Sequence, residues 1–109
     1  MAPKITFHET ATTVHLSVSI PSTSLSQISF ELFDQYLKIN IPSVSFLLMV
    51  DFPYLVNYQS GYTSFVYQAP LLLIKLEKKE AVEWKALVQL KNKEIEPIRK
   101  ESRARRDED

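Results

Sequence analysis

Hydrophobic and polar side chains alternate along much of the chain between residues 5 and 77. The clearest run is residues 13–20, in which every second residue is aliphatic. The same period of two returns in residues 28–32, 36–41 and 71–77. Successive side chains of a strand point to opposite faces, so each run predicts a strand with one buried face and one solvated face.

Two other stretches depart from this alternation. Residues 45–52 are apolar on both faces, which predicts either a central strand or a strand that is covered by a loop. Residues 54–69 hold the one glycine of the chain, Gly61, and four of its five tyrosines. We expect a long excursion there, with a short strand near residues 65–67 and with tyrosines that offer an adhesive patch to another protein.

Turn residues separate these runs, and no helical period appears before about residue 80. Three of the runs end at prolines, namely Pro21, Pro42 and Pro53. Short strands joined by Pro, Ser and Asp turns are typical of an antiparallel sandwich or barrel, and we favour the sandwich. The 109 residues suffice for one core and not for two, so we predict a single all-β body.

The chain changes character after its last predicted strand. Residues 80–87 predict one or two helical turns that carry Trp84 and Leu87 on one side. Trp84 then caps the open end of the core, a role that we favour over that of an exposed binding residue. A shift to nearly continuous charge predicts a boundary near residue 90, between a body of residues 1–90 and a charged tail of residues 91–109.

The charged tail contains good helix formers and one proline, Pro97. Proline lacks a backbone donor but is tolerated in a first turn, so we expect a helix to begin near Glu96 and not to run through Pro97. Its arginines leave no apolar face, which predicts a solvated helix or a disordered segment. Glu101 and the acidic end, residues 107–109, cancel the positive field that a nucleic-acid partner requires, so we expect none.

Composition argues against catalysis. The chain has no cysteine, and therefore neither a thiolate metal site nor a cysteine nucleophile. A single glycine cannot build a phosphate-binding loop. We expect both histidines, His8 and His15, to be surface residues, while the carboxylates Glu31, Asp34 and Asp51 stand singly. The prediction is a non-enzymatic protein that uses no metal and no cofactor.

The same composition indicates where the chain works. Its longest apolar run, residues 46–50, falls well short of the roughly 20 residues of a membrane-spanning helix. No secretory signal follows Met1, and the formal net charge is zero. With the absence of cysteine, these features predict a cytoplasmic protein that does not bind membranes.

Two stretches carry more distinctive motifs. Residues 36–42 read Tyr-Leu-Lys-Ile-Asn-Ile-Pro, and residues 76–87 read Leu-Glu-Lys-Lys-Glu-Ala-x-x-Trp-x-x-Leu. Both motifs resemble the CS domain, the sandwich shared by co-chaperones of heat-shock protein 90 and, distantly, by the small heat-shock proteins. Within this superfamily the chain is similar, over about residues 4–102, to the first domain of dynein axonemal assembly factors of the dyslexia-susceptibility type.

The resemblance implies an antiparallel, seven-stranded, immunoglobulin-like sandwich with a short C-terminal helical tail. The chain departs from the pattern at Phe7, where many relatives carry a tryptophan, and in the aromatic excursion of residues 54–69. The tetratricopeptide repeats that follow in the assembly factors are also missing.

By the same resemblance, the chain is a non-enzymatic adaptor between heat-shock protein 90, or related chaperone machinery, and dynein chains or dynein assembly factors in the cytoplasm of ciliated cells. The binding surface of related domains, on the outward face of one sheet, corresponds here to Tyr36, Lys38, Lys78 and Glu80. Lys78 is either a docking residue or a solubilising lysine beside a turn. The alternative function is a self-associating holdase like the small heat-shock proteins; an adaptor is expected to be a monomer and a holdase an oligomer.

Overall fold

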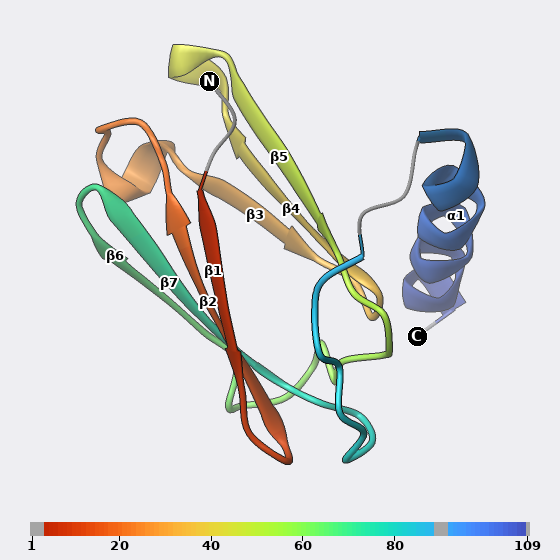
Figure 1. Ribbon diagram of the computed structural model, residues 1–109. Helices are drawn as coiled ribbons and strands as arrows, with labels where there is room; N and C mark the ends of the chain where they lie inside the picture. Colours follow the sequence, from red (N-terminus) through yellow and green to blue (C-terminus); the bar gives the residue numbers. More distant parts are fainter. Residues whose placement is uncertain (1–3, 89–91, 109) are drawn as a thin grey trace.

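The computed structural model describes residues 4–88 and 92–108 (Figure 1). In this part of the chain, seven strands form two layers and one α-helix lies beside them (Figure 1). The strands are β1 (Ile5–Glu9), β2 (Thr13–Ser19), β3 (Ser29–Leu32), β4 (Tyr36–Ile41), β5 (Phe46–Asp51), β6 (Ser64–Gln68) and β7 (Leu71–Glu77), and the helix is α1 (Asn92–Glu108).

All neighbouring strands are antiparallel. The larger sheet has the order β1-β2-β7-β6, and the smaller sheet has the order β3-β4-β5. In the smaller sheet, the pairing of β4 with β5 sets Leu37 opposite Val50. The predicted seven-stranded antiparallel sandwich with a short C-terminal helix is confirmed, whereas the predicted boundary near residue 90 lies outside the described residues.

The core lies between the inner faces of the two sheets, and it consists of the alternate side chains that the pattern predicts. The most deeply buried of them are Val14, Leu16 and Val18 of β2, Leu37, Ile39 and Ile41 of β4, and Leu72, Ile74 and Leu76 of β7. At one edge of the sandwich, the rings of Phe30 in β3 and Phe65 in β6 stack with their centroids 4.5 Å apart. This pair joins the two sheets where no strand connects them.

The segment after β7 closes the opposite edge. Trp84 is buried against Phe7 of β1 and against Phe52, with ring centroids 6.3 and 5.4 Å apart, so the predicted core role of Trp84 is confirmed. The predicted helical turns over residues 80–87 are wrong. The backbone N–H groups of Trp84 and Lys85 donate to the Glu9 carboxylate, at 2.9 and 2.8 Å, and not to helical carbonyls.

Residues 45–52, which are apolar on both faces, contain the edge strand β5, and a loop lies along it. β5 pairs with β4 on one side only, which excludes the central position. Along its other side runs the segment after Trp84, where the N–H of Val88 donates to the carbonyl of Asp51 at 3.2 Å. The apolar side chains of β5 are thus partly covered, as the second interpretation requires, although Leu47 stays exposed.

The charged tail forms a helix that begins earlier than predicted and packs on the sandwich. α1 begins at Asn92 and runs through Pro97, so the expected start near Glu96 is wrong. The buried side chain of Ile95 holds its first turns against the sandwich. This packing offsets the loss of the backbone hydrogen bond that Pro97 cannot donate. α1 lies beside the β3-β4-β5 sheet (Figure 1), attached by side chains described below, and not in free solution.

This helix is too short and too charged to cross a lipid bilayer, and the described residues contain no other α-helix.

Candidate protein-binding site

The outward face of the β1-β2-β7-β6 sheet is open to solvent and slightly hollowed. The register sets Thr6, Ser17, Leu73 and Val66 in one row across the four strands, and His8, His15, Lys75 and Ser64 in the next. These eight residues, with Gln68, line a shallow groove of about 390 Å³. We call this surface the open face.

The open face has an apolar centre, formed by Val66 and Leu73, and polar residues around it. Val66 is 46% exposed, and Leu73 is half-buried beside it. Beyond them the His8 and His15 rings lie 6.0 Å apart, and Nε2 of His15 is 3.1 Å from the Thr13 hydroxyl. Such a surface can bury apolar side chains of a partner while its rim forms hydrogen bonds.

Acidic groups are scarce on the open face. At the outward positions of its four described strands, Glu77 is the one carboxylate, and it accepts a hydrogen bond from the Asn57 amide at 3.2 Å. Within the described residues, no three His, Cys, Asp or Glu side chains gather as metal ligands would. His8 and His15 are surface residues, as predicted.

The outward face of the β3-β4-β5 sheet is, in contrast, partly covered by α1. Tyr36 is only 2% exposed, its ring stacks on Phe33 at 4.4 Å, and its hydroxyl accepts a hydrogen bond from Arg103 at 3.2 Å. The expectation that Tyr36 faces solvent is therefore wrong, because a helix 67 residues later in the chain covers it. Lys38, on the same face and half-buried, stands opposite Glu31 of β3.

Lys78 also differs from the expectation. The residue is 6% exposed, and its ammonium donates three hydrogen bonds, to the Glu9 carboxylate at 2.6 Å and to the carbonyls of Thr10 and Val82 at 2.8 and 2.9 Å. An ammonium has three donors, so none remains for a partner protein. Both the docking and the solubilising interpretations of Lys78 fail, since the side chain holds the β1–β2 hairpin against the segment after β7.

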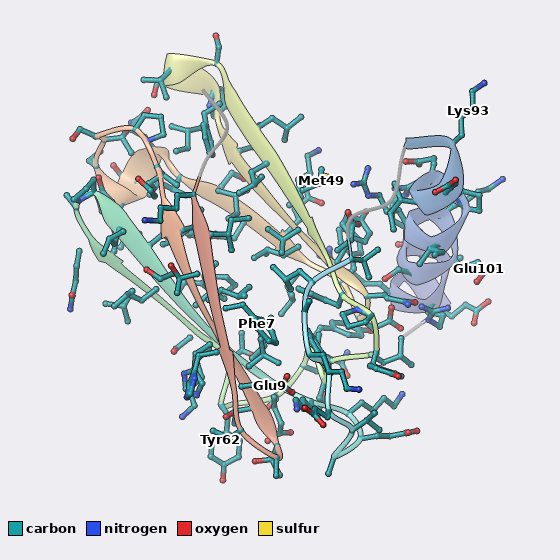
Figure 2. The ribbon with its side chains drawn as sticks, viewed as in Figure 1. Phe7, Glu9, Met49, Tyr62, Lys93 and Glu101 are labelled. Atoms are coloured by element: carbon teal, nitrogen blue, oxygen red, sulfur yellow. The ribbon has the colours of Figure 1, made fainter. Side chains whose placement is uncertain are left out.

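Glu9 completes this arrangement, which we call the Glu9–Lys78 clamp. Its carboxylate accepts hydrogen bonds from Lys78 and from the backbone N–H groups of Trp84 and Lys85. Figure 2 labels Glu9 near the end of β1, below Phe7. The hydrogen bond from Lys78, followed by that from Trp84, lowers the pKa of Glu9 from its usual 4.5 to about 2. The clamp is a structural element and not a reactive site.

Glu80, the fourth predicted residue, is exposed in the loop after β7. There it borders a groove that also contains Gln35, Lys79 and Arg105. The four predicted contact residues therefore do not share one surface: two lie on β4, one is buried in the clamp, and one lies in a loop. Sequence reasoning missed the open face, although Leu73, apolar at an outward position of an alternating strand, was a signal for it.

Comparison with known proteins bears on the fold. No protein-family model and no curated protein sequence matches the chain. Among solved structures, the nuclear movement protein from E. cuniculi GB-M1 superposes with a TM-score of 0.61 at 11% sequence identity, covering 79% of this chain and 99% of that one. Heat shock protein 16.0 from Schizosaccharomyces pombe superposes with a TM-score of 0.62 at 19% identity, covering 84% of this chain and 99% of that one.

Both neighbours are β-sandwiches of the type shared by CS domains and small heat-shock proteins. At these identities the likeness concerns the path of the backbone and not the surface residues. The predicted fold class is thereby confirmed: the chain has the immunoglobulin-like sandwich fold of the CS and small heat-shock protein type.

Proposed function

We propose that the chain is a non-enzymatic protein-interaction domain that binds a partner protein on the open face. The observation that carries this proposal is the exposed apolar centre formed by Val66 and Leu73 on a rigid four-stranded sheet. Backbone hydrogen bonds hold such a sheet in shape, so a partner that buries this centre needs little reorganisation of the domain. The polar rows around the centre supply orientation and specificity.

The partner that we favour belongs to the chaperone machinery. The Tyr-Leu-Lys-x-Asn-x-Pro strand and the Lys-Lys-Glu-Ala-x-x-Trp exit support this choice, as does the fold shared with heat shock protein 16.0. We therefore propose an adaptor that brings heat-shock protein 90 or related chaperones to dynein chains and dynein assembly factors in the cytoplasm. Lys38, on the middle strand β4, and Glu80, in the loop after β7, remain candidate contacts outside the open face, whereas the burial of Tyr36 and Lys78 argues against direct contact through those two.

Two exposed valines permit a matched test. Val66 lies on the open face and is 46% exposed, and Val44 lies at the far end of the other sheet and is 45% exposed. We expect Val66→Asp to weaken binding to isolated heat-shock protein 90 at least about tenfold, because it places a carboxylate in the apolar centre, and Val44→Asp to leave the Kd unchanged. Equal effects of the two changes, or no amide shifts on the open face at high chaperone concentration, would contradict the proposal.

The second candidate is a self-associating holdase. Its support is the sandwich shared with heat shock protein 16.0, together with the outer edge of β6, which pairs with no other strand among the described residues. Light scattering over a concentration series separates the two candidates. A stable oligomer that suppresses aggregation of a heated client favours the holdase, and a monomer that binds heat-shock protein 90 favours the adaptor.

A further inference from the structure

The surface beneath α1 is built as a receptor for arginine. All four arginines of the chain lie in α1, and each contacts the β3-β4-β5 side of the sandwich. We call this surface the receptor face; its residues are Phe33, Asp34, Gln35, Tyr36 and Asp51. It is a second surface, separate from the open face.

Two carboxylates of the receptor face each hold one guanidinium. Arg99 donates two hydrogen bonds to Asp51, at 2.8 and 2.7 Å, and Arg105 donates two to Asp34, at 2.5 and 2.9 Å. Paired bonds of this kind fit the planar guanidinium and not a lysine ammonium. Asp34 and Asp51 therefore recognise arginine specifically.

The two aromatic residues contribute a shelf. Phe33 and Tyr36 stack on one another, the guanidinium of Arg106 lies 4.6 Å from the centre of the Phe33 ring, and Arg103 donates to the Tyr36 hydroxyl. An arginine above an aromatic ring is attracted by the negative charge of the ring face. Each arginine of α1 thus has its own place.

Ser102 fixes the register of the helix on this surface. The side chain is fully buried, and its hydroxyl donates to Asp34 at 2.5 Å while it accepts from the backbone N–H of Gln35 at 3.0 Å. Burial opposes ionisation of Asp34, but the hydrogen bonds from Arg105 and Ser102 outweigh it and lower the pKa of that carboxyl. A larger residue at position 102 cannot fit without lifting the helix.

Apolar burial contributes little to this interface. On the described part of α1, Ile95 is the one buried apolar side chain and Ile98 is half-buried, whereas Ser102 and the four arginines contact the receptor face through polar or charged groups. The Arg99–Asp51 pair is largely buried, with side chains 13% and 11% exposed, and Asp34 is 7% exposed in its pair with Arg105, so salt screens these pairs only in part. The contacts have a defined geometry and charge, so a helix of another protein that offers the same groups would make the same contacts with this face.

We propose that the receptor face is a second protein-binding site, which takes an arginine-bearing helix of a partner protein in place of α1. The contacts of α1 define the sequence of a helix that would bind there. It begins with an aliphatic residue. Counted from that residue, arginine stands four positions later, a small hydroxyl residue seven positions later, and arginines ten and eleven positions later. In α1 these are Ile95, Arg99, Ser102, Arg105 and Arg106. The tethered α1 competes with every such partner, since its effective concentration at the face is high.

The test uses the full chain with α1 displaced by one substitution. Ser102→Glu sets a second carboxylate against Asp34 and overfills a buried position, so it releases the helix. The probe is a fluorescent peptide of residues 92–108 with the natural sequence. We expect it to bind the Ser102→Glu chain at least about tenfold more tightly than the unchanged chain, because the internal competitor is gone, and to bind less tightly as salt rises.

Two variants locate the site. Adding Asp34→Asn to the Ser102→Glu chain is expected to abolish peptide binding, and adding Val66→Asp, on the open face, is expected to leave it unchanged. If Ser102→Glu unfolds the sandwich, as shown by exposure of Trp84 in its fluorescence, the charge reversals Arg99→Glu and Arg105→Glu displace α1 instead. Failure of the peptide to bind any folded, helix-released chain would overturn the proposal, as would equal binding of a scrambled peptide. If the unchanged chain forms dimers that exchange α1, the receptor face binds the helix of a second copy. That result would overturn the proposal that it binds a helix of a different protein.

Discussion

Lys78 and Glu9 lie 69 residues apart in the sequence, and their side chains form an ion pair of 2.6 Å in which the lysine is almost fully buried. The pair joins the first hairpin to the end of the last strand. It also fixes the segment that carries Trp84, because the Glu9 carboxylate accepts hydrogen bonds from the backbone N–H groups of Trp84 and Lys85. One carboxylate therefore determines how this edge of the sandwich is closed.

The clamp is expected to be important for stability. Lys78→Met leaves the Glu9 carboxylate without its cation and two carbonyls without a donor, so we expect the free energy of unfolding to fall by about 3 kcal/mol. The neighbouring exposed lysine gives the control, and Lys79→Met is expected to change stability by less than about 0.5 kcal/mol. Urea unfolding followed by Trp84 fluorescence measures both. Equal losses would show that the clamp adds nothing specific.

The lowered pKa of Glu9 predicts a pH dependence with a definite sign. Above pH 4.5 this carboxyl is ionised in both folded and unfolded chains, so its contribution to stability is fully present there. As pH falls from 4.5 towards 2, the unfolded chain takes up the proton first, and the contribution is lost. The difference in unfolding free energy between the natural chain and Glu9→Gln should be constant above this window and shrink within it. A difference that grows on acidification would contradict the assignment.

The attachment of α1 is expected to depend on Asp51. Asp51→Asn removes the negative partner of Arg99, and we expect the helix to open roughly 30-fold more often, which corresponds to about 2 kcal/mol for hydrogen bonds between charged groups. Amide hydrogen exchange within α1 measures this opening. Glu101, 76% exposed in its side chain and on the same helix, supplies the control Glu101→Gln, for which exchange should stay unchanged. Unaltered exchange in Asp51→Asn would mean that the other contacts of α1, such as those of Ile95, Ser102 and Arg105, hold the helix without this ion pair.

Trp84 is predicted to contribute through its volume and not through its N–H. Its indole nitrogen is buried without a hydrogen-bond partner among the described residues. Trp84→Phe should therefore cost clearly less than Trp84→Ala, for which we expect a loss of about 4 kcal/mol from the cavity between Phe7 and Phe52. Thermal unfolding of the two variants compares them. Similar losses would indicate a polar contact that the indole makes on its own.

The strands were predictable because burial in a sandwich has a period that the sequence displays directly. Tyr36–Ile41 and Leu71–Glu77 agree with the predicted ranges, since Pro42 follows the first, Pro70 precedes the second, and their inner positions are uniformly aliphatic. The alternation of apolar and polar residues was therefore sufficient to predict these two strands. The short C-terminal helix was also predicted, although the buried Ile95 and the start at Asn92 were not foreseen.

Three of the errors share one cause, which is a polar contact between residues distant in sequence. Nothing near Lys78 reveals that Glu9 will bury it, and nothing near Tyr36 reveals Arg103 above its hydroxyl. The helical spacing of Trp84 and Leu87 was misleading for the same reason, since a distant carboxylate satisfies the backbone there. Exposure estimated from alternation alone fails at such sites.

The back-to-back layers have a geometric consequence. The open face and the receptor face belong to different sheets, whose outward surfaces point in opposite directions, and packed sheets lie only about 10 Å apart. Two macromolecules seated on these surfaces at once would be separated by the thickness of the sandwich and would not collide. A domain of this shape can act as a thin spacer that holds two unlike proteins at a fixed short separation.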